Sequence, residues 1–168
     1  MTASAHSYSQ SDTRPASPAS LPRQFISFRI DAEQYAIDIM AVREIKGWTA
    51  TTKLPNQPDY ILGVLNLRGA IVPIFDLRRR FGKGLTDATA MHVVMIASVK
   101  DRTVGLLADA VCDIITVDAG EIRPVPDLDR SADSEFLSGI IATKDGMVVL
   151  LALDALFAGP AAGIAEAA

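Results

Sequence analysis

Few of the side chains that usually carry catalysis or bind metals occur in this chain, and they are scattered. The histidines are His6 and His92, and the one cysteine is Cys112. A zinc site needs several Cys, His or carboxylate ligands at short spacings, and no such cluster is present in the sequence. A single cysteine also excludes an intrachain disulfide framework, which fits a reducing cytoplasm.

Phosphate binding and nucleophilic catalysis find no better support. Residues 81–84 read Phe-Gly-Lys-Gly, but they lack the other glycine and the hydroxyl residue of a phosphate-binding loop. No Gly-x-Ser-x-Gly elbow occurs in the sequence. Residues 78–80 are all arginine, and a run this short predicts a solvated helix face. We therefore expect no metal, no cofactor and no catalytic turnover.

Composition narrows the class of protein. The chain has 168 residues, of which 49% are apolar and 21% charged, as is typical of one globular domain. A net charge of -4 gives no basic surface for nucleic acid. No run approaches the roughly 18 uncharged apolar residues of a membrane span. We expect a cytoplasmic protein that neither binds nucleic acid nor inserts directly into a membrane.

The two ends of the chain differ in composition from its middle. Residues 1–22 are rich in Ser and Pro and poor in large apolar residues, which predicts a disordered tail. Residues 159–168 are mostly Ala and Gly, which predicts a flexible C-terminal tail. The ordered domain is therefore expected to span residues 23–158.

Short strands dominate the expected secondary structure of this domain. Ile26, Phe28 and Ile30 alternate with other residues, a period that predicts a half-buried strand. Residues 91–99 and 147–153 are apolar almost throughout, which indicates strands covered on both faces. Roughly nine or ten short strands with brief helices indicate an all-β fold. Two small barrels that share a core would cover both faces of the apolar runs.

Two positions are candidates for a protein–protein contact. Arg68 lies at a predicted hairpin turn, where an arginine is either solvated or an interface anchor. Val111 is predicted to share an outward strand face with Asp109 and Asp113, which makes it a candidate contact as well. The same alternation places Cys112 on the inner face, where we expect a small buried hydrophobe.

Four segments in chain order resemble the CheW-like domain family. The most extensive match is residues 66–77 (Asn-Leu-Arg-Gly-Ala-Ile-Val-Pro-Ile-Phe-Asp-Leu). Motifs within residues 35–45 precede it, and motifs within residues 104–113 and residues 121–124 (Glu-Ile-Arg-Pro) follow it. The likeness spans about residues 23–158 of the sequence. It implies an all-β fold of two small SH3-like five-stranded barrels packed side by side, with short helical segments.

The resemblance also implies a function without enzymatic activity. Family members are adaptors that couple chemoreceptors to a CheA-type histidine kinase in bacterial chemosensory signal transduction. The expected partners are the cytoplasmic tip of a chemoreceptor and the regulatory domain of the kinase. An adaptor of this kind is recruited from the cytoplasm to membrane-associated receptor arrays.

Site residues follow from the same resemblance. Arg68 becomes an expected interface anchor, and Glu44 an expected polar contact to receptor or kinase. Ile39 and Val42 would line an apolar groove that receives a receptor helix. Packing in the core is the alternative for Ile39 and Val42, and solvation is the alternative for Glu44. For Val111, the alternative is an isolated exposed valine without a partner.

A small β-barrel enzyme or ligand-binding protein is the alternative function. Such a protein should have a deep pocket in which titratable groups converge. An adaptor should instead present shallow apolar grooves with polar rims. The shape and lining of the clefts therefore discriminate between the two functions.

Overall fold

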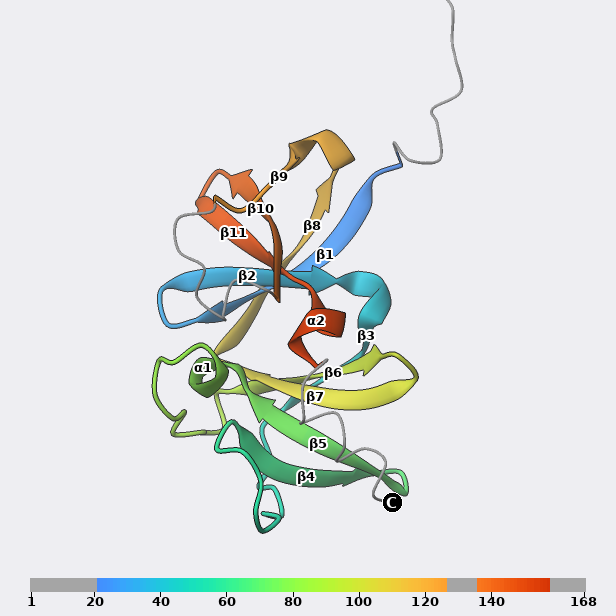
Figure 1. Ribbon diagram of the computed structural model, residues 1–168, viewed down its shortest axis with the longest axis vertical. Helices are drawn as coiled ribbons and strands as arrows, with labels where there is room; N and C mark the ends of the chain where they lie inside the picture. Colours follow the sequence, from blue (N-terminus) through green and yellow to red (C-terminus); the bar gives the residue numbers. More distant parts are fainter. Residues whose placement is uncertain (1–20, 127–135, 158–168) are drawn as a thin grey trace, which may run out of the picture.

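The computed structural model describes residues 21–126 and 136–157. Except for residues 21 and 22, the tails predicted at residues 1–22 and 159–168 lie outside this range. Within it, two β-sheets account for most of the structure (Figure 1). No helix in the described ranges is long and apolar enough to cross a membrane.

The first sheet, here called the first lobe, has the strand order β8-β1-β2-β11-β10-β9. Its strands are β1 (Arg23–Ile30), β2 (Glu33–Asp38), β8 (Ala110–Val117), β9 (Ile122–Arg123), β10 (Leu137–Thr143) and β11 (Gly146–Leu151). Neighbouring strands are antiparallel except β11 and β2, which pair in parallel. The sixth strand, absent from the expected five-stranded barrel, is the two-residue β9.

The second sheet, here called the second lobe, has the order β3-β6-β7-β5-β4. Its strands are β3 (Val42–Gly47), β4 (Ile61–Leu67), β5 (Ala70–Asp76), β6 (Val93–Val99) and β7 (Arg102–Ala108). Short helices complete the described fold: η2 (Ile39–Ala41), α1 (Leu77–Arg80), η3 (Ala119–Glu121) and α2 (Leu153–Leu156). The predicted all-β class with brief helices is confirmed.

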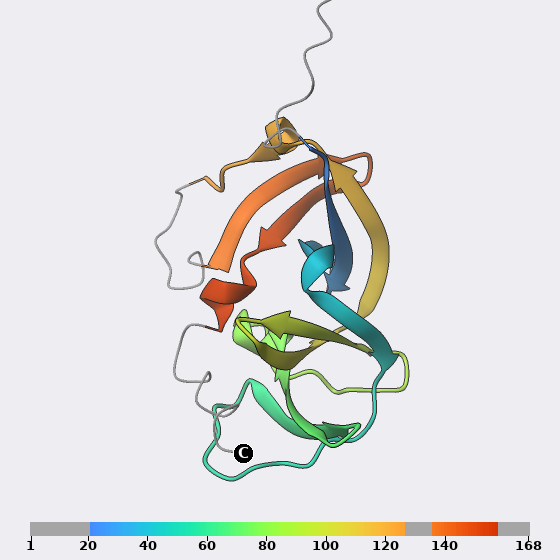
Figure 2. The same ribbon diagram turned by 90° about the vertical axis from the view of Figure 1, so that its right-hand side faces the viewer.

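The described chain crosses between the lobes at two places, one before the second lobe and one after it. It leaves the first lobe through η2 into β3, and it returns where β7 ends and β8 begins. Figure 2 shows the first lobe above the second, with η2 and β3 descending between them. The first lobe is thus built from two segments that are distant in sequence, β1–β2 and β8–β11, whereas the second lobe is continuous from β3 to β7.

A hydrophobic core shared by both lobes joins them. The apolar runs at residues 91–99 and 147–153 predicted such a core, because they need cover on both faces. One cluster of buried residues contains Phe28 and Ile37 from the first lobe with Met95 and Leu106 from the second. In β6, residues 94–97 are all buried, because the strand has this core on one face and the core of its own lobe on the other. Burying a side chain of this size stabilises the fold by about 1.5–3 kcal/mol.

The ends of the two apolar runs do not follow the prediction. Met91 lies in a turn before β6 and is 82% exposed. Met147 follows the turn between β10 and β11 and is 69% exposed. Both residues sit where the chain enters a strand from the surface, so neither is covered on two faces.

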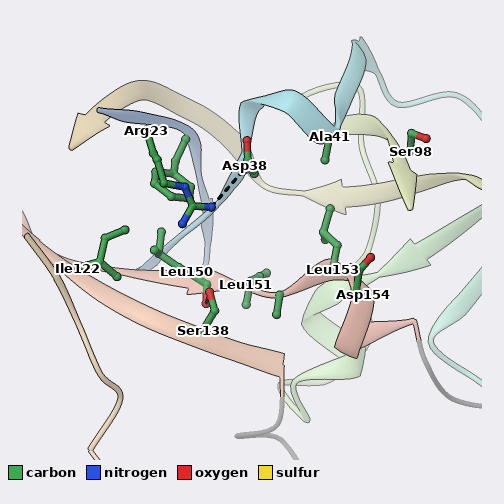
Figure 3. Close-up of a pocket in the computed structure, with 12 residues that line it drawn as sticks. Arg23, Asp38, Ala41, Ser98, Ile122, Ser138, Leu150, Leu151, Leu153 and Asp154 are labelled. Atoms are coloured by element: carbon green, nitrogen blue, oxygen red, sulfur yellow. Dashed lines mark hydrogen bonds and ion pairs between the residues drawn. The ribbon is translucent and has the colours of Figure 1, made fainter. Parts of the chain in front are cut away.

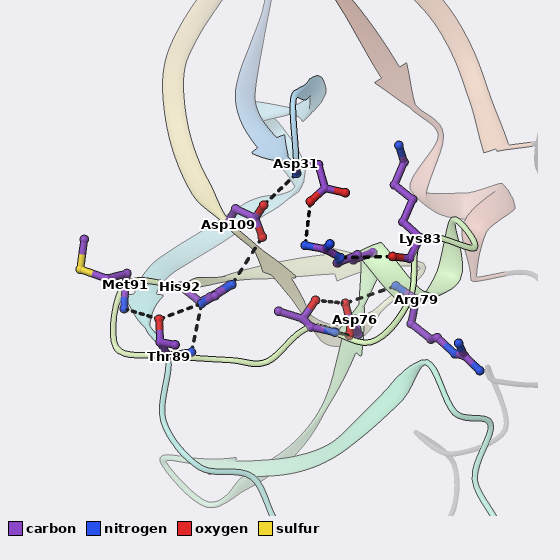
Figure 4. A network of polar contacts seen from close by, with 10 residues as sticks. Asp31, Asp76, Arg79, Lys83, Thr89, Met91, His92 and Asp109 are labelled. Atoms are coloured by element: carbon purple, nitrogen blue, oxygen red, sulfur yellow. Dashed lines mark hydrogen bonds and ion pairs between the residues drawn. The ribbon is translucent and has the colours of Figure 1, made fainter.

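Polar contacts fix the lobes against each other around the shared core (Figure 4). Arg78 Nη1 of α1 lies 2.7 Å from Asp31 Oδ1 in the turn between β1 and β2. Lys83 Nζ lies 2.9 Å from Glu33 Oε2. Asp109, at the return crossing, accepts a hydrogen bond from the Asp31 N–H at 2.8 Å. These contacts hold the β1–β2 turn of the first lobe on the second lobe.

The three arginines of α1 are therefore not a solvated face as predicted. Arg78 joins the lobes, and Arg79 forms an ion pair with Asp59 that lowers the pKa of that carboxyl group. Arg80 lies over the rings of Tyr60 and Phe136, 5.2 and 4.9 Å from their centroids. The partners come from segments distant in sequence, which is why a local pattern could not reveal them.

Candidate functional site

Arg68 lies at the tip of the hairpin formed by β4 and β5. Arg68 and Gly69 form a two-residue loop after the last strand pair, Leu67 with Ala70. Both loop residues have positive φ, 53° at Arg68 and 89° at Gly69. The side chain of Arg68 is 83% exposed, so it contributes almost nothing to the core. The predicted turn is confirmed, and its arginine is accessible to a partner.

Glu44, another predicted site residue, is the side chain that Arg68 contacts. Arg68 Nη2 donates a hydrogen bond to Glu44 Oε2 at 3.3 Å. Glu44 belongs to β3 and Arg68 follows β4, and these strands are the two ends of the sheet order. The ion pair therefore spans the closure of the second lobe, where a bridge between Thr52 and Val64 also joins the edges.

This ion pair positions the guanidinium more than it stabilises the fold. Exposed pairs contribute about 0–1 kcal/mol. A guanidinium carries five N–H donors, so Arg68 can keep Glu44 and still donate to a carboxylate or carbonyl of a second protein.

For Ile39 and Val42 the sequence left two readings open, packing in the core and contact with a receptor helix. Each side chain is half-buried and packs against the shared core. Each also keeps accessible surface where the chain crosses between the lobes. Ile45, two strand positions after Arg43, is 43% exposed and was not predicted. Its exposure follows from the alternation in β3, in which every second side chain faces solvent.

Val111 also packs against the shared core while half-buried. The predicted burial of Cys112 is wrong, because this residue is exposed. The register of β1 with β8 shifts between Ser27 and Phe28, which pair with Asp113 and Val111 and leave Cys112 as the extra residue. A β-bulge of this kind breaks the strict alternation on which the prediction rested.

The predicted neighbours of Val111 also differ from the expectation. Asp109 does not flank it as a free carboxylate, because Asp109 is bound by the N–H of Asp31. Further along β8, Ile114 is 55% exposed, although alternation in step with Cys112 would put it on the inner face. The exposure of Cys112 could not be predicted without the bulge, and no residue pattern in β8 indicates that a bulge is present.

Strands β3 and β8 lie on the same side of the molecule, the right-hand side in Figure 2. Each strand carries a half-buried residue on the shared core, Val42 and Val111, and an exposed isoleucine, Ile45 and Ile114. The exposed isoleucines, together with the Arg68–Glu44 pair that joins the β4–β5 turn to β3, are residue types found at protein interfaces.

A cleft of about 350 Å³ opens between the lobes (Figure 3). Phe25, Leu150 and Leu153 supply apolar lining. Of the charged side chains in the lining, Arg23 and Asp38 pair with each other at 3.2 Å, and Asp154 of α2 is the third. This lining suits a bound apolar surface and provides no nucleophile with an adjacent base.

One arrangement has the residue types of a hydrolytic triad. Figure 4 shows His92 between Thr89 and Asp109, with Nδ1 3.1 Å from Thr89 Oγ1 and Nε2 3.4 Å from Asp109 Oδ1. However, Nδ1 also accepts the backbone N–H of Thr89 at 3.0 Å. None of the three residues lines the inter-lobe cleft. His92 thus ties the loop before β6 to the return crossing.

Metal binding finds no support in the part of the chain that the structure describes. No group of three or more His, Cys, Asp or Glu side chains there could hold an ion.

Comparisons with known proteins agree with this geometry. The family model described as "CheW-like domain" matches residues 24–161. "Chemotaxis protein CheW" of Rhizobium meliloti (strain 1021) is 45% identical over 135 residues, which cover 80% of this chain and 87% of that protein. "Chemotaxis protein CheW" of Klebsiella aerogenes is 37% identical, with 80% and 81% covered.

A solved structure is similar over nearly its whole length. The crystal structure of "scaffolding protein TtCheW" from Thermoanaerobacter tengcongensis superimposes with a TM-score of 0.76 at 34% sequence identity. The match covers 83% of this chain and 95% of that one.

Proposed function

The chain belongs to the CheW-like domain family, and from this premise we propose that it couples a chemoreceptor's cytoplasmic tip to the regulatory domain of a CheA-type histidine kinase. The protein is a chemotaxis adaptor and not an enzyme. It acts by holding two proteins together, so its function resides in its surfaces.

The observation that carries the proposal is the exposed Arg68, already oriented by Glu44 at the edge of β3. Arginine is enriched among the residues that dominate binding energy at protein interfaces. Val42 and Ile39 lie where the chain crosses between the lobes, and Val111 packs on the same shared core. We assign these five residues to partner binding, with Arg68 and Glu44 as its polar component.

A helix is the kind of partner that fits this combination. An amphipathic helix places apolar side chains in a groove and uses polar residues at the rim to fix its register. Half-buried Ile39, Val42 and Val111 provide apolar contact without exposing the core, and Arg68 provides the polar contact. We propose that the helical hairpin tip of a chemoreceptor supplies this surface.

Coupling requires that the adaptor be rigid between its two contacts. The shared core, the Arg78–Asp31 pair and the Lys83–Glu33 pair hold the lobes together. A partner on one lobe can then bias the orientation of a partner on the other. Coupling free energies of this kind are typically about 1–3 kcal/mol. Weak contacts become firm when many copies are tethered in an array.

The protein is proposed to act in the cytoplasm and to reach the membrane only through receptor arrays. Recruitment through a receptor requires no membrane-binding surface of its own. The net charge of -4 also disfavours binding to nucleic acid or to anionic lipid.

Affinity capture from the native cell tests the proposal, followed by binary titrations with each captured protein. We expect a chemoreceptor and a CheA-type kinase among the specific partners, each binding the purified chain alone and both binding together. Capture of neither protein, or strict competition between them, would contradict the proposed coupling.

A further inference from the structure

The turn that carries Arg68 does not have the residue that its geometry favours. Two-residue hairpin loops with positive φ at both positions prefer Asn-Gly or Asp-Gly. Here Arg68 occupies the first position with φ of 53°, followed by Gly69 with φ of 89°. Left-handed backbone is disfavoured for a residue with a long side chain. The hairpin would therefore be more stable with asparagine at position 68.

Asn66 supports the turn in this unfavourable conformation. Its Oδ1 accepts a hydrogen bond from the Gly69 N–H at 2.9 Å. That N–H belongs to the peptide between Arg68 and Gly69, so the bond fixes the rotation of this peptide. Asn66 is exposed and pairs with Ile71 in the register of the hairpin.

Arg68 is consequently held at both ends. Asn66 fixes the backbone on which the side chain starts, and Glu44 binds the guanidinium at 3.3 Å. Left-handed backbone alone does not mark function, since Lys100 shares it, but at Arg68 the side chain is also held by Glu44 and is exposed to a partner.

We propose that Asn66 is a positioning residue, which aims Arg68 at its partner by holding the Arg68–Gly69 peptide. In this arrangement the left-handed arginine lowers the stability of the turn and provides the contact. The inference rests on the proposed function, because it assumes that Arg68 contacts a partner.

Lys100 provides a matched control for the backbone effect. It occupies the first position of the two-residue loop between β6 and β7, with φ of 48°, and Asp101 follows with φ of 65°. Arg68→Asn and Lys100→Asn should each raise Tm by about 2–4 °C, because asparagine tolerates left-handed backbone. Only Arg68→Asn should weaken binding to the kinase regulatory domain or the receptor-tip fragment, by at least about tenfold. A Tm that falls in Arg68→Asn would contradict the claim of strain.

Asn66→Ala tests the positioning role, because it keeps Arg68 and removes the hydrogen bond. We expect affinity to fall roughly threefold to tenfold, with partial recovery in Asn66→Asp, whose carboxylate can accept the same N–H. The strong intraresidue cross-peak between the amide and α protons of Arg68, which marks positive φ, should weaken in Asn66→Ala and return in Asn66→Asp. Asn66→Gln, with its amide one methylene further out, should behave like Asn66→Ala and serves as a second variant if that protein does not fold.

The outcomes separate this inference from the proposed function. Wild-type affinity in Asn66→Ala would overturn the positioning role even if Arg68→Ala fails to bind. Lower affinity with an unchanged Arg68 cross-peak would also overturn it, because Asn66 would then contact the partner itself. Wild-type affinity of Arg68→Ala for both partners would instead refute the proposed contact.

Discussion

Replacing Arg68 by alanine should separate binding from folding. The side chain is 83% exposed, and its ion pair with Glu44 is worth about 0–1 kcal/mol. Alanine is as poorly suited to a φ of 53° as arginine, so no strain is relieved. The free energy of unfolding should therefore change by less than about 0.5 kcal/mol, as for surface substitutions generally.

Binding should suffer much more from the same change. An interface arginine that loses a charge-assisted hydrogen bond commonly costs on the order of 2 kcal/mol. This corresponds to a loss of affinity of roughly thirtyfold, because each 1.4 kcal/mol is a factor of ten.

The assay is calorimetric titration of Arg68→Ala with the receptor-tip fragment and with the kinase regulatory domain, beside a denaturant unfolding curve. Glu44→Gln serves as a partner variant, since it keeps Arg68 but removes the carboxylate that orients it. We expect Glu44→Gln to bind more weakly than wild type and more tightly than Arg68→Ala. Wild-type affinity of Arg68→Ala for both partners, or its unfolding, would refute the reasoning.

Three further predictions concern stability. Gly105→Ala should cost about 1–3 kcal/mol in a denaturant unfolding curve, because its Cβ would overlap the buried Ile74 Cδ1; an unchanged midpoint would show that the core can yield there. Hydrogen bonds from Tyr35 and Lys83 lower the pKa of Glu33 in the folded state. Its contribution to stability is present above the unfolded pKa and is lost as pH falls through the folded value, so Glu33→Gln should flatten the acid limb of a stability curve below about pH 5; an identical limb would contradict this. Deleting residues 1–22 should leave Tm unchanged, given their Ser and Pro content, and a large loss of Tm would show that they contribute to the fold.

Local patterns predicted the parts of the fold that depend on local chemistry. The apolar run around residues 94–97 gave a doubly buried strand, and Gly69 gave the hairpin turn. The shared core followed because such a run needs cover on both faces. These features depend on residue type and spacing, which the sequence carries directly.

Features that depend on distant partners could not be predicted in this way. The bulge at Cys112 arises from the register between β1 and β8, so strand alternation misplaced Cys112 and missed Ile114. Arg78 looked solvated because its partner Asp31 lies in the other lobe. The pairing of Arg68 with Glu44 was also invisible, although both had been identified as candidates through the family resemblance.

The coupling of two partners is the central claim, and kinase activity in a reconstituted array tests it most directly. Receptor fragments, a CheA-type kinase and this chain are mixed, and autophosphorylation of the kinase is followed with and without receptor ligand. We predict that the kinase responds to receptor ligand only when the chain is present, and that Arg68→Ala reduces this response while Lys100→Ala preserves it. An equal response to receptor ligand in the absence of the chain would contradict the account.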